Sequence, residues 1–238
     1  MKRIIIAAAC LALSAATLLP VSAGNASAVT PEEAQRVIAL AFERGITIYK
    51  KYTGIEYSRK ETVSEYDPAT KKLKSVSEIT MKRKDYFYKE PEIEVLTYRK
   101  DGKEMDPSKF RVMKSMPLYP AFDEKGNDNY RFTVVGKVRH SGKECYCIQV
   151  EPRIISSRHF RGSIYATVNN LDMVSIEGTM AKLDFPIKEF HIALEMKNVD
   201  GVPIARSGEV HVRVNVPVFY PDTLIVSSLE TLDTKLMQ

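Results

Sequence analysis

The histidines are the first residues to test for chemistry in this 238-residue chain, because imidazole binds metals and transfers protons. His191 and His211 fall on the polar positions of two alternating segments, which adjacent strands would bring together. Glu189 or Glu209 could add a carboxylate, but metal sites use three or four ligands. Two solvated histidines on strands are therefore the preferred interpretation, and we predict no metal ion and no cofactor.

Two cysteines stand two positions apart, in the run Lys143-Glu144-Cys145-Tyr146-Cys147-Ile148. On a regular strand Cys145 and Cys147 share a face with their Cα atoms about 6.5–7 Å apart, at the limit of the disulfide range. The sequence leaves a strained disulfide and two free thiols both open. The spacing is not C-x-x-C and no helix N-terminus is evident, which argues against a redox-active pair.

Motifs of known catalytic centres are missing from the sequence. It has no Gly-rich phosphate loop, no H-E-x-x-H and no G-x-S-x-G. Acidic pairs such as Glu189 and Glu195 have no spacing that implies catalysis. We therefore name no catalytic residue and predict that the chain is not an enzyme.

Alternating strands are the elements that would position any of these groups. In segment 208–216 valine occupies every even position from 210, and polar residues occupy the odd positions up to 215. Segment 189–196 repeats the pattern, with apolar residues at the even positions and mostly polar ones between them. Successive side chains on a strand point to opposite faces, so these segments predict an antiparallel sheet with one continuous apolar surface.

An amphipathic helix is predicted at the start of the mature chain. Thr30 suits the N-cap, Pro31 the first helical position, and Glu33 completes a capping box. The helix should run to about Tyr52, and its apolar stripe should pack onto the sheet.

The rest of the chain reads as hairpins joined by turns, which gives a mainly β (α+β) fold. The predicted strands are 55–66, 72–82, 86–88, 93–98, 130–138, 144–150, 160–168, 173–178, 189–196, 208–216 and 223–228. Segment 105–129 loses the alternation and could be a lid over a cavity or an ordinary core plug. Within it, 126–129 reads as a flexible connection.

The first 28 residues have the pattern of a secretory signal peptide. Lys2 and Arg3 precede an apolar core at positions 4–19, and Ala26-Ser27-Ala28 forms a small-residue cleavage site, with Val21-Ser22-Ala23 as a competitor. The apolar core is short for a membrane span. We predict cleavage near Ala28 and an exported product without a transmembrane segment, whose residues 29–238 form a single domain.

Charge argues against several partners. Cleavage after Ala28 removes two positive charges, so the formal net charge falls from +5 to +3. Basic and acidic residues are interspersed along the strands, which does not support nucleic-acid binding. The same interspersion gives no polybasic block for an anionic membrane.

Short motifs in the C-terminal half resemble a known superfamily. They are Val150-Glu151-Pro152, Phe160-Arg161-Gly162-Ser163-Ile164-Tyr165, Leu171-Asp172-Met173-Val174 and Asp200-Gly201-Val202-Pro203. With the N-terminal helix, they resemble the LolA/LolB-like superfamily of periplasmic lipoprotein carriers over most of residues 30–236. The resemblance implies a half-open β-barrel whose apolar concavity, covered by the helix and loops, carries acyl chains or lipidated proteins. Some related domains instead sense envelope stress.

The leading hypothesis from the sequence is therefore a periplasmic, non-enzymatic carrier or chaperone for a lipid, an acyl chain or a lipoprotein. Its ligand-binding residues are predicted from the apolar strand faces: Tyr146, Ile148, Val174, Ile176, Phe190, Ile192, Leu194, Met196, Val210, Val212, Val214 and Val216. A dry core made by the same residues stays open. The alternative function is an envelope protein-interaction module, a stress-sensing regulator or assembly factor, without a small-molecule ligand.

Overall fold

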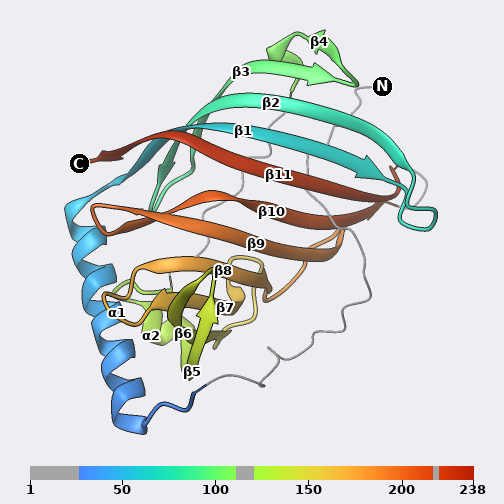
Figure 1. The fold of residues 1–238 in the computed structure, drawn as a ribbon. Helices are drawn as coiled ribbons and strands as arrows, with labels where there is room; N and C mark the ends of the chain where they lie inside the picture. The colour runs from blue at the N-terminus through green and yellow to red at the C-terminus, as the bar shows by residue number, and fades with distance from the viewer. Residues whose placement is uncertain (1–26, 111–120, 217–219) are drawn as a thin grey trace.

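A curved antiparallel sheet dominates the computed structural model, which describes residues 27–110, 121–216 and 220–238 (Figure 1). Within these ranges, eleven strands form one sheet in the order β4-β3-β2-β1-β11-β10-β9-β8-β7-β6-β5. The strands are β1 Gly54–Tyr66, β2 Leu73–Tyr86, β3 Glu92–Lys100, β4 Lys103–Met105, β5 Tyr130–His140, β6 Lys143–Pro152, β7 Phe160–Thr167, β8 Met173–Met180, β9 Ile187–Val199, β10 Val202–Val216 and β11 Tyr220–Met237. Because β4 and β5 do not pair with each other, the barrel is open, as predicted.

Helix α1, Pro31–Lys51, lies beside the β5–β8 end of this sheet (Figure 1). Thr30 caps it as predicted, since its hydroxyl accepts a hydrogen bond from the Glu33 backbone N–H at 3.2 Å. The Glu33 carboxylate does not complete the predicted capping box. It contacts β5 and β6 instead, accepting from the Tyr146 hydroxyl at 2.7 Å and pairing with Lys137 at 2.9 Å. The first turn of α1 is thereby fixed to the sheet. No helix in the described part of the chain is long and apolar enough to span a membrane.

The two largest of the four apolar clusters among the described residues meet at Phe190, which packs against both. The β1–β3 cluster consists of Val63, Ile79, Met81, Tyr98, Val212, Val214, Leu224 and Ile225. The α1 cluster consists of Val37, Tyr130, Tyr146, Ile148, Val150, Phe160, Ile164, Ala166 and Ile192. These residues are all buried, so each cluster removes its apolar surface from water.

Several predicted boundaries were wrong, because contacts distant in sequence override the local pattern; β10, for example, begins at Val202 rather than at 208. Segments 72–82 and 86–88 were predicted as separate strands, but β2 continues to Tyr86 and ends there. Phe87 packs edge-on against Tyr49 of α1, with ring centroids 4.7 Å apart. Segment 126–129 is a short helix, α2 Gly126–Asn129, rather than a flexible connection. Strand β11 is far longer than the predicted 223–228, because it pairs with both β1 and β10.

Segment 105–129 and the predicted signal peptide are only partly included in the described residues. A short 3-10 helix, η2 Pro107–Lys109, follows Asp106, whose carboxylate accepts from the Ser108 backbone N–H at 3.0 Å. Residues 111–120 of the predicted lid or plug, and residues 1–26 of the predicted signal peptide, lie outside the described residues.

Candidate functional site

The twelve residues predicted to bind a ligand are divided among different surroundings. Val212 and Val214 belong to the β1–β3 cluster, and Tyr146, Ile148 and Ile192 to the α1 cluster. Of the half-buried members, Ile176, Phe190 and Val210 pack against these clusters, and Leu194, Met196 and Val216 belong to neither. Eight of the twelve residues thus belong to one of these two clusters or pack against one. Ligand binding by the set stays a prediction.

Val174 lies apart from the other eleven residues. It packs with Cys145, Cys147 and Tyr165 in a cluster on the opposite face of β6 from Tyr146. The register between β7 and β8 shifts here, since Tyr165 pairs with Ser175 while Ala166 pairs with Met173. Val174 is the extra residue of this bulge, and the alternation that placed it on the ligand face is broken at that position.

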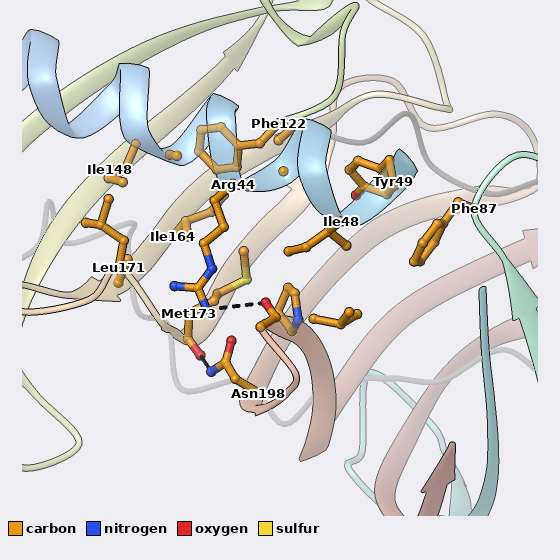
Figure 2. Close-up of a pocket in the computed structure, with 17 residues that line it drawn as sticks. Arg44, Ile48, Tyr49, Phe87, Phe122, Ile148, Ile164, Leu171, Met173 and Asn198 are labelled. Carbon is orange, nitrogen blue, oxygen red and sulfur yellow. Dashed lines mark hydrogen bonds between the residues drawn. The ribbon is translucent and has the colours of Figure 1, made fainter. Parts of the chain in front are cut away.

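An apolar cavity of about 140 Å³ lies between α1 and strands β6–β8 (Figure 2). The helix contributes Ala41, Gly45 and Ile48, and Ile148 of the predicted set lies on the sheet side. Further lining residues come from the sheet and from its turns: Ile164, Ala166, Leu171, Met173, Asn198, Val202 and Pro203. The cavity is therefore a gap in the packing of α1 on the sheet, next to the α1 cluster.

Small residues on α1 border this cavity. Ala41 and Gly45 are one helical turn apart and face the same side. A Cβ at Gly45 would lie 1.9 Å from the backbone oxygen of Phe122, so only glycine allows the chain at Phe122 to approach so closely. The i, i+4 pair of small residues is the sequence signal that could have located the cavity, and the apolar strand pattern alone did not.

A wider groove of about 590 Å³ adjoins the cavity on the solvent side. It runs between α1 and two turns, the β7–β8 turn around Asn170 and the β9–β10 turn at Gly201. Arg44, Ile48, Leu171 and Gly201 line both the cavity and the groove. The groove is lined by Tyr146 and by exposed Leu40 as well, so an apolar path runs from solvent toward the cavity.

Arg44 bridges α1 to both turns at the boundary between groove and cavity (Figure 2). Its guanidinium forms an ion pair with Asp172 and donates to the backbone oxygens of Asn170 and, at 3.4 Å, of Gly201. Both charged side chains are partly buried. A planar guanidinium can satisfy several acceptors at once, so this one side chain holds three segments together.

Hydrogen bonds at the start of α1 also hold the helix against the sheet, and they shift the pKa values of the groups involved. The hydrogen bond from Lys137 is the main cause that lowers the pKa of Glu33, with the bond from Tyr146 second. Burial, followed by the hydrogen bond to Glu33, raises the pKa of Tyr146, which therefore stays a neutral donor. At the other end of the cavity, burial raises the pKa of Tyr49 well above its usual value. Tyr146 in the groove and Tyr49 in the cavity wall are thus neutral phenols, and Arg44 is the charged side chain that lines both spaces.

The histidines and cysteines do not form a reactive centre among the described residues. His191 and His211 are directly paired across β9 and β10, with ring centroids 5.9 Å apart, as their alternation predicted. Glu209 is 2.9 Å from His211, whereas Glu189 pairs with Arg213 instead. No group of three or more metal-ligating side chains is found in the described ranges.

The two thiols, which the sequence left undecided, are free and buried. Burial is the first cause that raises the pKa of each, for both Cys145 and Cys147. A raised pKa keeps a thiol protonated and unreactive. These cysteines therefore act as small packing residues on the face of β6 turned away from α1.

No protein-family model matches the chain, and no curated protein matches it. Similar solved structures do exist. A domain from Vibrio parahaemolyticus, described as an outer membrane lipoprotein-sorting protein, is 10% identical with a TM-score of 0.45, covering 85% of this chain and 92% of that one. A LolA superfamily protein from Nitrosomonas europaea is 10% identical with a TM-score of 0.45, covering 89% and 95%.

A third similar structure is the Pseudomonas aeruginosa MucA/MucB complex, 9% identical with a TM-score of 0.26 and covering 85% of this chain and 98% of the other. The superfamily named for the Nitrosomonas protein is the one that the sequence resembles. An open antiparallel sheet with an N-terminal helix is also the architecture that this resemblance implied. With TM-scores below 0.5, none of these structures assigns a function to this chain.

Proposed function

We propose that the chain is a non-enzymatic binding protein for an amphiphile with an alkyl chain, acting as a carrier in the periplasm. The observation that carries the proposal is the apolar cavity under α1, joined to an open groove at Arg44. The alkyl end enters the cavity and the polar end remains in the groove. Export rests on the signal-peptide pattern of the first 28 residues.

The size of the cavity decides how much of the ligand it holds. An apolar protein cavity of about 150 Å³ accommodates a molecule such as benzene, and the cavity here is about 140 Å³. It therefore holds the last few carbons of a chain, and the remainder lies along Leu40, Val168 and Leu171 in the groove. Each methylene removed from water contributes about 0.8 kcal/mol.

Entry requires α1 to move away from the two turns. Arg44 is the contact that must open, because it joins the helix to Asp172, Asn170 and Gly201. Its hydrogen bonds re-form once the alkyl chain is inside. The ligand is bound and released unchanged, so no bond is made or broken.

Filling the cavity tests the proposal directly. Ala41→Leu places three additional carbons in the space, whereas Ala39→Leu makes the same change two residues away at an exposed position outside both cavity and groove. Calorimetric titration with dodecanoate should show affinity reduced about tenfold or more in Ala41→Leu and unchanged in Ala39→Leu. Equal affinities in all three proteins, or no binding by the unmodified chain, would reject the alkyl site.

A second candidate, a protein-interaction module, is favoured by one observation at the β5 edge. The Ser27 backbone donates to and accepts from Lys137, each at 2.9 Å, so this edge accepts an antiparallel strand. Cleavage after Ala28 would remove Ser27 and free the edge for a partner strand. Native mass spectrometry of protein from its own host separates the two functions, since co-purifying lipid indicates the carrier and a bound polypeptide indicates the module.

A further inference from the structure

Three large apolar side chains protrude from two loops at one end of the sheet. Ile154 and Ile155 lie in the β6–β7 loop and are 55% and 56% exposed, and Phe185 in the β8–β9 loop is 71% exposed. These three side chains present apolar surface to water, and removing that surface from water is favourable. Neither the cavity nor the groove uses any of them.

The two loops are neighbours in space. The Ala181 backbone N–H donates to the His159 carbonyl oxygen at 2.7 Å, which ties the loops together at their bases. The Ser157 side chain is also the first cause that lowers the pKa of the Asp184 carboxyl, so one residue of each loop lies beside the other. Because the strands are antiparallel, these loops lie at the end of β6–β9 opposite to the β7–β8 and β9–β10 turns that border the groove.

The β6–β7 loop is anchored rather than loose, so its apolar residues are held outward. The Arg153 guanidinium donates to the backbone oxygens of Asn127 at 2.8 Å and Tyr130 at 3.0 Å. His159 is buried and its Nδ1 is 2.7 Å from the Ser156 hydroxyl. The backbone between these anchors presents Ile154 and Ile155 to solvent in a fixed arrangement.

Charge at this end is mainly positive. Segments 153–159 and 181–188 contain Arg153, Arg158, Lys182 and Lys188 against the single acidic residue Asp184. Lys182 pairs with Asp184 at 3.0 Å, while Lys188 is exposed. These basic residues are too far apart in sequence to form a polybasic block, but the fold places all four at the same end of the sheet as the apolar side chains.

We propose that this end of the sheet docks on an anionic lipid surface, with Ile154, Ile155 and Phe185 inserted between the headgroups. Protruding apolar side chains surrounded by basic ones match the membrane interface, where acyl chains lie beneath negative headgroups. The two contributions act together, because neither three apolar side chains nor a few lysines alone bind a bilayer firmly. Docking here leaves the groove at the opposite end accessible, and it does not depend on whether the cavity binds an amphiphile.

Vesicle sedimentation with the exported chain tests the proposal. The protein should sediment with vesicles containing phosphatidylglycerol and not with pure phosphatidylcholine, and added salt should release it. Phe185→Ser should weaken binding about tenfold, and Leu73→Ser, a 54% exposed leucine at the start of β2, should leave it unchanged. Lys188→Gln should weaken it about fivefold, and Lys60→Gln, at an exposed position on β1, should not.

Folding is checked by the thermal midpoint, which these exposed substitutions should leave unchanged. Binding that is equally weakened by Leu73→Ser, or that is the same for both vesicle types, overturns the proposal. So does a chain that fails to bind vesicles but self-associates through Phe185, since a second copy would then be the occupant.

Discussion

At the scale of single residues, Arg44 lies outside the packed clusters, and its loss should still lower the stability of the protein. Its guanidinium serves one carboxylate and two backbone oxygens on two separate turns. Arg44→Ala should lower the free energy of unfolding by about 1–2 kcal/mol, because charge-assisted bonds at a partly buried site are lost. Urea unfolding measures the change.

Lys50→Ala is the matched control for Arg44→Ala on the same helix. Lys50 pairs with Glu124 at 2.9 Å, but both side chains are about two-thirds exposed, so its loss should change stability by less than about 0.5 kcal/mol. Equal effects of the two substitutions would show that Arg44 does not join α1 to the turns.

Alternation predicted the faces of individual residues wherever a strand is regular. Tyr146 and Ile148 lie with the α1 cluster, and Cys145 and Cys147 lie on the other face, as a period of two requires. The face of Val174 was predicted wrongly, because a bulge cannot be recognised from the pattern of a single strand. The cavity was not predicted for a different reason. Its size depends on how closely α1 approaches the sheet, which no local pattern specifies.

At the scale of elements, strands β7 and β8 approach each other unusually closely at a glycine pair. Gly162 is directly opposite Gly178, and a Cβ at Gly162 would lie 2.1 Å from the Glu177 carbonyl oxygen and 2.6 Å from the Phe160 ring. Gly162→Ala should therefore lower the free energy of unfolding by at least about 2 kcal/mol, since backbone would have to shift. The measurement is a urea-unfolding midpoint.

A turn glycine provides the comparison for Gly162→Ala. Gly142 has a φ of 77° and nothing within 4 Å of an added Cβ, so Gly142→Ala costs only the left-handed conformation, about 1 kcal/mol. If Gly142→Ala proved the more damaging of the two, the close approach of β7 and β8 would be refuted.

Turns were the most predictable boundaries of the elements, because turn chemistry is local. Asp67 accepts from the Ala69 and Thr70 backbone N–H groups, and Asp101-Gly102 adopts positive φ at both residues, as their types predict. Segments 87–88 and 126–129 were mispredicted because packing decides them, with Phe87 held against α1 and Gly126 held under Phe42. The strand pattern alone contains neither contact.

At the scale of the whole molecule, the sequence pattern predicted an antiparallel sheet but could not say whether it closes. Closure depends on twist summed over eleven strands, and no segment contains that sum. The prediction that the barrel is open came from the resemblance to the LolA/LolB-like superfamily. The basic loop end was missed for a related reason: Arg153 and Lys188 are far apart in sequence, and only the β6–β9 order places both at the same end of the sheet.

Acid should destabilise the whole molecule before its carboxylates titrate. Burial is the first cause that lowers the pKa of His140, His159 and His191 below the ordinary 6.5. As the pH falls through that value the unfolded chain takes up these protons first, so stability present above pH 6.5 is lost toward the lower folded pKa values. The urea midpoint should therefore decrease as the pH is lowered from about 7.5 to about 5.5.

Carboxylates with a lowered pKa, such as Glu33, add a second loss of stability only below their ordinary pKa of 4.5. His140→Gln, which can still hydrogen-bond Ser175, should reduce the first loss and leave the second. A midpoint that is constant or rises over the upper window would contradict the burial of these imidazoles.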